Sequence, residues 1–285
     1  MNERKAALVC CSNALKPEKR EMVASLVNRL GEYGIQTVLS RHMFSDIPWG
    51  HGTGEERARQ LMEFYEDDSV TEIYDISGGD LANELLPFLD FELIRRSGKL
   101  FFGYSDLTVL INAIYHKTGR EGVLYQVRNL LSDKTGCQRK RFDTDHLYGV
   151  PCTFLRGERM EGIVVGGNIR CFLKLAGTEY FPDLTGKILL LEAFGGDIPQ
   201  MRTYISQLEQ LGGFEKAAGI LLGTFTKLEE NGAGTLLEEL VLEKSGDLCV
   251  AKTQSIGHGT DSAAARIGGF CRISGGECYW VKPQK

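Results

Sequence analysis

Short strand-like segments alternate with segments of helical spacing along the chain, and this alternation restricts the fold more than any other feature of the sequence. Strands are predicted over residues 6–11, 36–39, 71–76, 100–103 and 123–126. Helices are predicted over residues 17–33 and 55–65, around Leu81, Leu85, Leu86 and Leu89, and from Leu107 to Tyr115. Strands that alternate with helices imply right-handed crossovers and a mostly parallel sheet. We therefore predict an α/β fold.

A similar alternation resumes after residue 160. Strands are predicted over residues 162–165, 187–191 and 219–222 and through Val250, helices up to Leu175 and over 201–211 and 236–242, and a closing hairpin over 270–281. Residues 127–160 are polar and irregular, apart from the apolar residues at 147–148 and 152–155. We predict an N-terminal domain over 1–126, a connecting segment over 127–160 that folds over the site as a substrate loop, and a C-terminal domain over 161–285.

The composition excludes several classes of protein. The chain has 285 residues, of which 42% are hydrophobic and 25% charged, and its net charge is −5. These values are ordinary for a globular protein, and no basic stripe extends beyond the cluster at residues 139–141, so we expect no nucleic-acid polymer and no membrane as a partner. No apolar run approaches the ~18 residues of a membrane span, and the N-terminal apolar stretch is too short for a signal peptide. We expect a cytoplasmic protein.

Cysteine and histidine usage gives no sign of disulfides or of a metal. The eight cysteines form no Cys-x-x-Cys pair, and several lie in apolar strand-like runs, as expected for small buried side chains in a reducing compartment. The five histidines show no clustered ligand spacing. We expect neither a metal nor another cofactor.

Ser105 stands at the junction of a predicted strand and a predicted helix. The apolar run ends on Gly103, and residues at helical spacing begin at Leu107. Free backbone N–H groups and the positive end of the helix dipole surround such a position, where an oxyanion would be stabilised. The alternative is a simple helix cap, with Asp106 as a favourable acidic residue in the first turn.

Glu192 and His258 are the other candidates for chemistry. Glu192 follows the most apolar predicted strand, where a buried carboxylate needs a partner or must reach solvent. His258 lies between two glycines, so that its ring is uncrowded and its backbone can turn sharply. A strand-end glutamate in water and a lone surface or core histidine are the plainer interpretations. Taken together with Ser105, the three residues are the parts of a Ser-His-Glu relay.

A glycine turn precedes the serine turn by one strand. Ser77-Gly78-Gly79-Asp80 follows the third predicted strand, and a glycine pair there lets the backbone approach a ligand and direct N–H groups at it. An ordinary tight turn is the alternative. Because Ser105 lies at the carboxyl end of the next strand, and ligands of open α/β sheets bind at those ends, we expect the two turns to share a site.

These turns belong to a wider pattern of motifs. The motifs are Ser77-Gly78-Gly79, Leu85-Leu86-Pro87-Phe88-Leu89-Asp90, Gly103-Tyr104-Ser105-Asp106-Leu107-Thr108, Gly166-Gly167-Asn168, Leu191-Glu192 and Ile256-Gly257-His258-Gly259. In order and spacing they resemble the LD-carboxypeptidase family of serine peptidases over nearly the whole chain.

The resemblance implies a fold and a set of roles. The fold is a flavodoxin-like or amidotransferase-like N-terminal domain with a parallel sheet plus a smaller α/β C-terminal domain, commonly as a homodimer. Ser105 would be the nucleophile, His258 the general base and Glu192 the residue that orients it. Backbone N–H groups of Gly79 and Asp106 would form the oxyanion hole. Gly78 and Asp80, in the same glycine turn, are the candidates for substrate contact.

Two branches of the family differ in substrate. Muropeptide LD-carboxypeptidases release D-alanine from murein tetrapeptides and usually carry Arg-Gly-Gly-Tyr-Gly at the glycine turn, where this chain has Ser77 and Asp80. The motif of this chain is more similar to that of the microcin C self-immunity branch, which cleaves an amide between an aspartyl group and a modified nucleotide. The lost arginine favours a small peptide or aminoacyl-nucleotide amide over a murein peptide. The residues that could supply a replacement cation are Arg128, Arg139, Lys140, Arg141 and Arg266.

Two other classes remain as alternatives to a serine peptidase. A protein of the same fold could bind a small peptide or nucleotide without cutting it, although all three positions of the relay are filled. An amidotransferase-type cysteine enzyme would need a cysteine at the strand-to-helix turn, and position 105 is serine.

Overall fold

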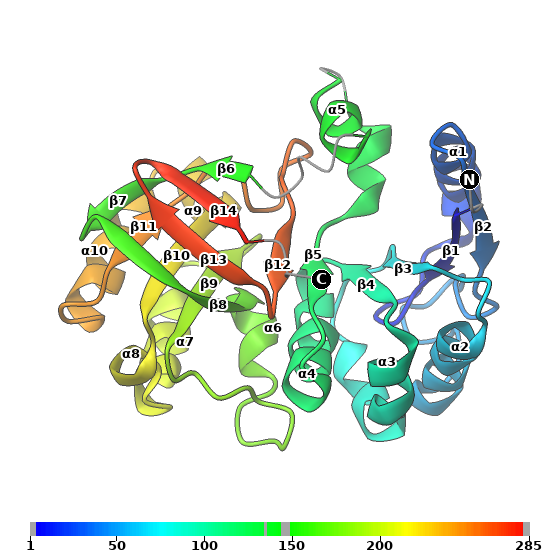
Figure 1. Cartoon of the computed structure of the whole chain (residues 1–285), viewed down its shortest axis with the longest axis horizontal. Coiled ribbons are helices and arrows are strands. Elements are labelled where there is room, and N and C mark those ends of the chain that lie inside the picture. Colours follow the sequence, from blue (N-terminus) through cyan, green and yellow to red (C-terminus); the bar gives the residue numbers. More distant parts are fainter. Residues whose placement is uncertain (1–3, 134–135, 144–148, 282–285) are drawn as a thin grey trace.

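The computed structural model describes residues 4–133, 136–143 and 149–281, with the backbone alone at residues 141 and 143. The apolar residues at 147–148 lie outside the described residues. The chain forms two β-sheets with helices around them (Figure 1).

The first sheet has six strands in the order β12-β5-β4-β3-β1-β2. Its strands are β1 (Arg4–Val9), β2 (Ile35–Leu39), β3 (Glu72–Asp75), β4 (Leu100–Gly103), β5 (Gly122–Leu124) and β12 (Ala265–Ile267). Strands β1 to β5 pair in parallel, whereas β12 pairs antiparallel to β5. The order β2-β1-β3-β4-β5 is that of flavodoxin-like folds, whose ligands bind where the order reverses, beside the carboxyl ends of β1 and β3.

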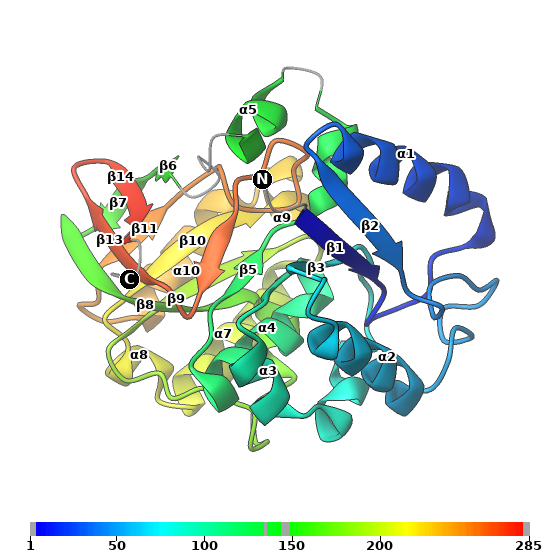
Figure 2. The ribbon, with the colours of Figure 1, turned by 45° about the vertical axis from the view of Figure 1, so that its right-hand side comes forward.

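Helices cover both faces of the first sheet. These helices are η1 (Pro17–Lys19), α1 (Arg20–Gly31), α2 (Gly54–Glu66), η2 (Ala82–Phe88), α3 (Phe91–Ser97), η3 (Ser105–Leu107) and α4 (Thr108–Thr118). Helix α1 packs on the face that carries Tyr74 and Phe102, and α2, α3 and α4 pack on the opposite face with Ile73 and Phe101. Figures 1 and 2 show α1 on one side of the sheet and α2 to α4 on the other. Successive strand residues face opposite ways, so a strand buried on both faces is apolar throughout.

The second sheet has eight strands in the order β6-β14-β13-β8-β9-β10-β11-β7. Its strands are β6 (Gly149–Pro151), β7 (Thr153–Arg156), β8 (Arg159–Asn168), β9 (Lys187–Ala193), β10 (Gly219–Phe225), β11 (Val250–Lys252), β13 (Phe270–Ser274) and β14 (Glu277–Trp280). Strands β8 to β11 are parallel. Only Cys152 separates β6 from β7, yet these strands lie at opposite ends of the order, so the sheet curls until its two edges meet.

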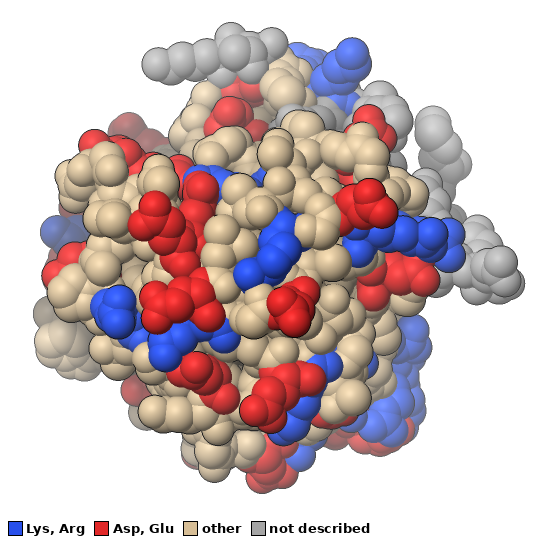
Figure 3. All heavy atoms as spheres, turned by 90° about the vertical axis from the view of Figure 1, so that its left-hand side faces the viewer, with Lys and Arg blue, Asp and Glu red and all other residues tan. Residues whose placement is uncertain are grey.

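Further helices accompany the second half of the chain. They are η4 (Val127–Leu131), α5 (Cys137–Asp143), α6 (Ile169–Leu173), α7 (Ile198–Gln210), α8 (Gly213–Lys216), α9 (Thr226–Glu230) and α10 (Gly234–Lys244). Each helix of the described residues is too short or too polar to span a bilayer. On the face shown in Figure 3, acidic and basic side chains are interspersed among uncharged residues.

The structure confirms the predicted alternation and corrects one part of it. The helix predicted around Leu81, Leu85, Leu86 and Leu89 is present as the 3-10 helix η2 (Ala82–Phe88), with Pro87 inside it. Proline lacks the N–H that a continuing α-helix needs, and Asp90 then caps α3 by accepting from the N–H groups of Glu92 and Leu93 at 2.9 Å. The segment 127–160 is not irregular throughout, since it contains η4, α5, β6 and β7. The domain boundaries 1–126, 127–160 and 161–285 stay a prediction.

Candidate active site

Ser105 lies in a strained turn at the carboxyl end of β4. Its φ is 58°, which makes it the one residue other than glycine with a positive φ in the part of the chain that the structure describes. Such a conformation costs about 1–3 kcal/mol and is typical of nucleophiles held on a strand-to-helix turn. The turn also requires Gly103, because a Cβ there would lie 2.6 Å from Cβ of Leu107. Ser105 is half-buried and begins η3, which continues into α4.

Glu192 and His258 form a hydrogen-bonded pair. Glu192 is the last residue but one of β9 and its side chain is fully buried, while that of His258 is 15% exposed. Oε2 of Glu192 lies 2.8 Å from Nδ1 of His258. This contact holds the imidazole in one orientation and leaves Nε2 free to exchange a proton with another group.

The loop that carries His258 is held close to β10. The Thr224 N–H donates to the Ile256 carbonyl at 2.8 Å, and the Ser262 hydroxyl donates to the Gly257 carbonyl at 2.6 Å. Only glycine fits at position 257, because a Cβ there would lie 1.7 Å from Oγ1 of Thr224. The loop is therefore fixed on both sides of the histidine.

Two aromatic rings flank the imidazole. The Tyr104 ring lies 4.9 Å from it, edge to face, and the Phe194 ring lies 5.2 Å from it. Burial, together with the nearby Glu192 carboxylate, raises the pKa of Tyr104 well above its ordinary value, so Tyr104 stays neutral. His258 therefore contacts two rings and the buried carboxylate, and it also lines the cavities.

Two cavities meet at Ser105 and His258, which line both of them. The first has a volume of about 400 Å³ and is bordered by the glycine turn at Gly78 and by η4. The second has a volume of about 390 Å³ and is bordered by Gly79, Asp80 and the loop after β9. A substrate that spans both cavities would place its central bond beside Ser105.

Gly79 has a backbone conformation and surroundings that require glycine. Its φ is 130°, and Asn13 occupies the place where a Cβ would lie. The Asp80 N–H donates to Oδ1 of Asn13 at 3.0 Å, which fixes the turn from outside. Among the described residues, the Gly79 N–H has no hydrogen-bond partner. Its predicted role in the oxyanion hole stays a prediction.

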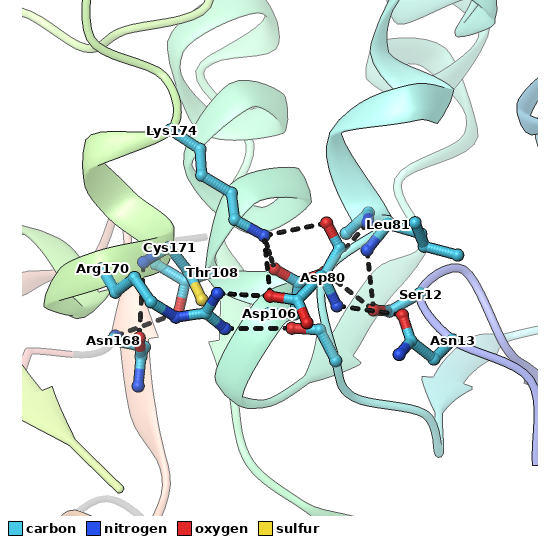
Figure 4. Close-up of polar contacts among 12 residues, drawn as sticks. Ser12, Asn13, Asp80, Leu81, Asp106, Thr108, Asn168, Arg170, Cys171 and Lys174 are labelled. Carbon is cyan, nitrogen blue, oxygen red and sulfur yellow. Dashed lines mark hydrogen bonds and ion pairs between the residues drawn. The ribbon is translucent and has the colours of Figure 1, made fainter. Parts of the chain in front are cut away.

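The side chain of Asp80 is engaged by two cations from α6 and the residue after it (Figure 4). It pairs with Arg170, which also donates to the Gly79 carbonyl at 3.1 Å, and Lys174 lies 3.8 Å away. The hydrogen bond from Arg170 lowers the pKa of Asp80 below its ordinary value. Asp80 therefore stays ionised at the border of the second cavity, while Gly78 borders the first.

Asp106 anchors the site through a fully buried carboxylate (Figure 4). It accepts from the Ser12 hydroxyl at 2.7 Å, from the Ala82 N–H at 2.9 Å and from Nζ of Lys174 at 2.5 Å. A buried charge needs such partners, and here they come from both halves of the chain. The side chain thus fixes the position of the Asp106 backbone N–H that was predicted for the oxyanion hole.

Sequence reasoning missed the residues that brace the site. Arg170 and Lys174 follow the Gly166-Gly167-Asn168 motif at a helical spacing of four, and Asn168 caps α6 by accepting from the Cys171 N–H at 3.3 Å. Two cations at this spacing lie on one face of a helix, and this was the one sequence feature that could have pointed to them. Nothing in the sequence indicates that they pair with acids about 70 to 90 residues earlier. Within the described ranges, no group of three or more His, Cys, Asp or Glu side chains could hold a metal ion.

Comparison with known proteins covers both halves of the chain. The profile of the LD-carboxypeptidase N-terminal domain matches residues 6–126, and that of the LD-carboxypeptidase C-terminal domain matches residues 161–273. The chain is 30% identical to YocD of Bacillus subtilis, which is named as a carboxypeptidase, with 88% of each chain covered. It is 25% identical to the murein tetrapeptide carboxypeptidase of Pseudomonas aeruginosa, over 97% of this chain and 95% of that protein. It is 30% identical to the microcin C7 self-immunity protein MccF of Escherichia coli, over 60% of this chain and 61% of that protein.

Solved structures show the same fold. MccF in complex with aspartyl sulfamoyl adenosine superposes with a TM-score of 0.86 at 21% identity, over 99% of this chain and 97% of that one. An MccF-like protein from Bacillus anthracis gives a TM-score of 0.85 at 24% identity, over 100% of this chain and 95% of that one. The predicted α/β fold with a parallel sheet and two-domain organisation is thereby confirmed. With matching profiles in both halves and a relative at 30% identity over most of its length, the chain belongs to the LD-carboxypeptidase family.

Proposed function

We propose that this chain is a serine peptidase or amidase in which Ser105 is the nucleophile, His258 the general base and Glu192 the residue that orients the imidazole. The observation that carries the proposal is the 2.8 Å contact between Oε2 of the buried Glu192 and Nδ1 of His258, beside the two cavities that His258 shares with Ser105. The positive φ of Ser105 supports it further, since strain of this kind is typical of a nucleophile turn.

The reaction follows from these positions. Oγ of Ser105 attacks the acyl carbon of the substrate amide, and its proton passes to Nε2 of His258. His258 then gives this proton to the amide nitrogen as the carbon–nitrogen bond breaks, which releases the amine and leaves an acyl ester on Ser105. A water molecule attacks the ester, its proton goes to His258, and the acid is released as Ser105 recovers a proton from His258.

Backbone groups would stabilise the negative oxygen that forms at each attack. The N–H groups of Gly79 and Asp106 are our candidates. The Gly79 N–H has no partner among the described residues, and the Asp106 backbone is fixed by its buried carboxylate. A donor of this kind contributes about 2.7–4 kcal/mol to transition-state stabilisation.

For the substrate we propose a small peptide or an aminoacyl-nucleotide amide, as in the microcin C self-immunity branch. The structural relative MccF has been solved with aspartyl sulfamoyl adenosine. Ser77, which stands where the murein branch has arginine, is buried, and its hydroxyl lies 2.5 Å from Oδ1 of Asp75. The glycine turn therefore presents no side-chain cation to a substrate carboxylate.

Release of D-alanine from a murein tetrapeptide is the second candidate. It is favoured by Arg128, a cation from η4 that borders the first cavity. The murein tetrapeptide carboxypeptidase of Pseudomonas aeruginosa is also similar over nearly the whole chain. The cytoplasmic location and the homodimer stay predictions.

Mass spectrometry of the products from a substrate panel tests the proposal. The panel holds a murein tetrapeptide, other peptides that end in a D-amino acid, and aspartyl sulfamoyl adenosine. We expect hydrolysis of at least one member, unaffected by a chelator because the mechanism uses no metal, with kcat/KM about tenfold or more in favour of the aminoacyl nucleotide. A clear preference for D-alanine release would overturn the substrate assignment. Tight binding without any hydrolysis would instead support a binding protein.

A further inference from the structure

One cation that lines the first cavity forms no ion pair with any described residue. Arg128 lies on η4, directly after the first sheet, and lines this cavity together with Ser105, His258 and Gly78. Its Nε is buried and has no hydrogen-bond partner. Among the described residues, its guanidinium takes part in no hydrogen bond and no ion pair. A partly buried guanidinium without a partner is costly, so a feature of this kind points to a ligand that supplies the missing acceptors.

The nearest acid does not satisfy this charge. Asp75 is fully buried at the end of β3 and attracts Arg128 without forming an ion pair with it. The Asp75 carboxylate already accepts from the N–H groups of Cys11 and Ser77, each at 2.7 Å, and from the Ser77 hydroxyl at 2.5 Å. Its acceptors are occupied by these groups, and Arg128 lines the cavity without an acidic partner among the described residues.

Lys19 also lines the first cavity but is exposed to solvent. The other cations near the site are already paired or lie outside the cavities. Arg170 is bonded to Asp80 and to the Gly79 carbonyl, and Lys174 is bonded to the Asp80 carbonyl and to Asp106. Arg266, on β12, pairs with Glu121 at 3.0 Å. Arg139 is exposed and borders neither cavity. Of the cations proposed from the sequence as replacements for the missing arginine, Arg128 is the one whose described side chain reaches the site.

We propose that Arg128 is the anion-recognition residue of this site and binds, in the first cavity, the negatively charged group of the substrate that lies next to the scissile amide. The inference rests on the proposed function, because it assumes that Ser105 attacks an amide placed between the two cavities. Two sources offer the same chemistry. One is the terminal carboxylate of a D-amino-acid peptide, and the other is the acidic linker of an aminoacyl nucleotide. Both present oxygen acceptors that fit a planar guanidinium.

The test compares charged ligands with neutral counterparts. Affinity is measured by calorimetry in a Ser105→Ala background, so that binding does not depend on turnover. The ligands are a D-alanine-terminated tetrapeptide and its C-terminal amide, and aspartyl sulfamoyl adenosine and an analogue with a neutral linker. Each is measured with Arg128 intact, with Arg128→Gln and with Arg128→Lys. Arg139→Gln, which removes an exposed arginine that borders neither cavity, is the matched control.

We expect Arg128→Gln to weaken binding of one charged ligand by about 10- to 100-fold, as for a lost charge-assisted hydrogen bond. The neutral counterpart should change by less than about threefold, Arg128→Lys should restore part of the loss, and Arg139→Gln should change nothing. The ligand that responds identifies the source of the anion. Equal losses for charged and neutral ligands, or no loss for either charged ligand, would overturn the proposal.

The outcome is separable from that of the proposed function. If the wild-type protein hydrolyses no member of the panel, the peptidase proposal fails, while the charge-dependent binding result still decides the role of Arg128. If hydrolysis occurs and Arg128→Gln leaves KM and kcat unchanged on the charged substrate, the triad stands and the assignment of Arg128 is wrong.

Discussion

The Glu192 carboxylate binds one nitrogen of an imidazole and has no exposure to water. Burying such a charge costs several kcal/mol unless a partner compensates, and the contact with His258 is that partner. In the proposed mechanism, the same contact sets the orientation in which His258 takes a proton from Ser105. In this proposal Glu192 acts through His258, as a positioning residue.

Glu192→Gln tests this role at nearly constant volume. A glutamine can donate to Nδ1 and favour the wrong tautomer, so we expect kcat to fall on the order of 10³- to 10⁴-fold, with KM little changed. Thermal unfolding should shift by only a few degrees, and the exposed Glu243→Gln should leave kcat intact. Equal kcat for Glu192→Gln and the wild type would contradict the orienting role.

At the residue scale, the sequence could predict site residues that lie at the ends of strands. Ser105, Glu192 and His258 each stand where an apolar run stops or a glycine pair opens the chain, and such points gather at the carboxyl edge of a parallel sheet. The sequence could not select Arg128 over four other cations, because that choice depends on which side chains find partners. Arg170 and Lys174 were missed for the same reason.

Strand β8 shows how closely the elements approach one another near the site. Gly166 has φ 105°, and a Cβ there would lie 2.2 Å from the Leu190 carbonyl oxygen. The neighbouring strand β9 also carries Glu192, so a shift of its backbone would displace that side chain. Packing of this kind permits only glycine.

Gly166→Ala should therefore destabilise the protein by about 2–4 kcal/mol, through both the clash and the positive φ. Gly31→Ala is the matched control, because Gly31 ends α1 with nothing within 4 Å of the place that a Cβ would occupy, and alanine is the better helix former. Urea unfolding measures both. A Gly166→Ala variant as stable as the wild type would contradict this packing.

A buried histidine just before α2 makes the stability of the protein depend on pH. Burial, assisted by the Arg57 guanidinium, lowers the pKa of His51 to about 4, whereas an unfolded histidine titrates near about 6.5. Unfolding therefore takes up a proton between these values. Stability is complete above about pH 6.5 and falls by up to about 1.4 kcal/mol per pH unit as the pH drops toward 4.

The measurement is urea unfolding of the wild type and of His51→Gln at several pH values in this range. The difference between the two proteins isolates His51 from other groups that titrate there. We expect this difference to shrink as the pH falls. A difference that is constant with pH would show that His51 titrates alike in the folded and unfolded chains.

At the element scale, periodicity predicted most strands and helices to within a few residues. Around Leu81 to Leu89 the predicted helix is a 3-10 helix, because Pro87 lacks the N–H that an α-helix would need there. Periodicity missed the short strands β6, β7 and β12. Neighbours from distant parts of the chain decide the pairing of these strands, which a local pattern does not show.

The whole molecule is joined across its two sheets beside the site. Strand β12, from the second half of the chain, pairs with β5 of the first sheet. Asn112 on α4 donates to the Gly166 carbonyl at 2.8 Å and accepts from the Gly166 N–H at 2.9 Å. The helix that follows Ser105 is thereby tied to the strand beside Glu192. Local sequence patterns do not show such long-range links. The resemblance to the family predicted only that residues of both halves share one site.

Asn112→Ala should weaken this link. It leaves buried N–H and carbonyl groups of Gly166 without their partner, at a cost of about 2–4 kcal/mol in the free energy of unfolding. In the proposed mechanism this link would position Ser105 relative to His258, so we expect kcat to fall more than KM rises. Wild-type stability and kcat in this variant would show that the two sheets are aligned without Asn112.

The most direct test of the central claim is the turnover of Ser105→Ala on whichever panel substrate the wild type hydrolyses. We predict that kcat falls on the order of 10⁴-fold or more, since loss of the nucleophile disables the whole relay. The unfolding transition should stay close to that of the wild type, and the exposed Ser25→Ala should turn over normally. A pure, folded Ser105→Ala protein with near wild-type kcat would contradict the serine mechanism.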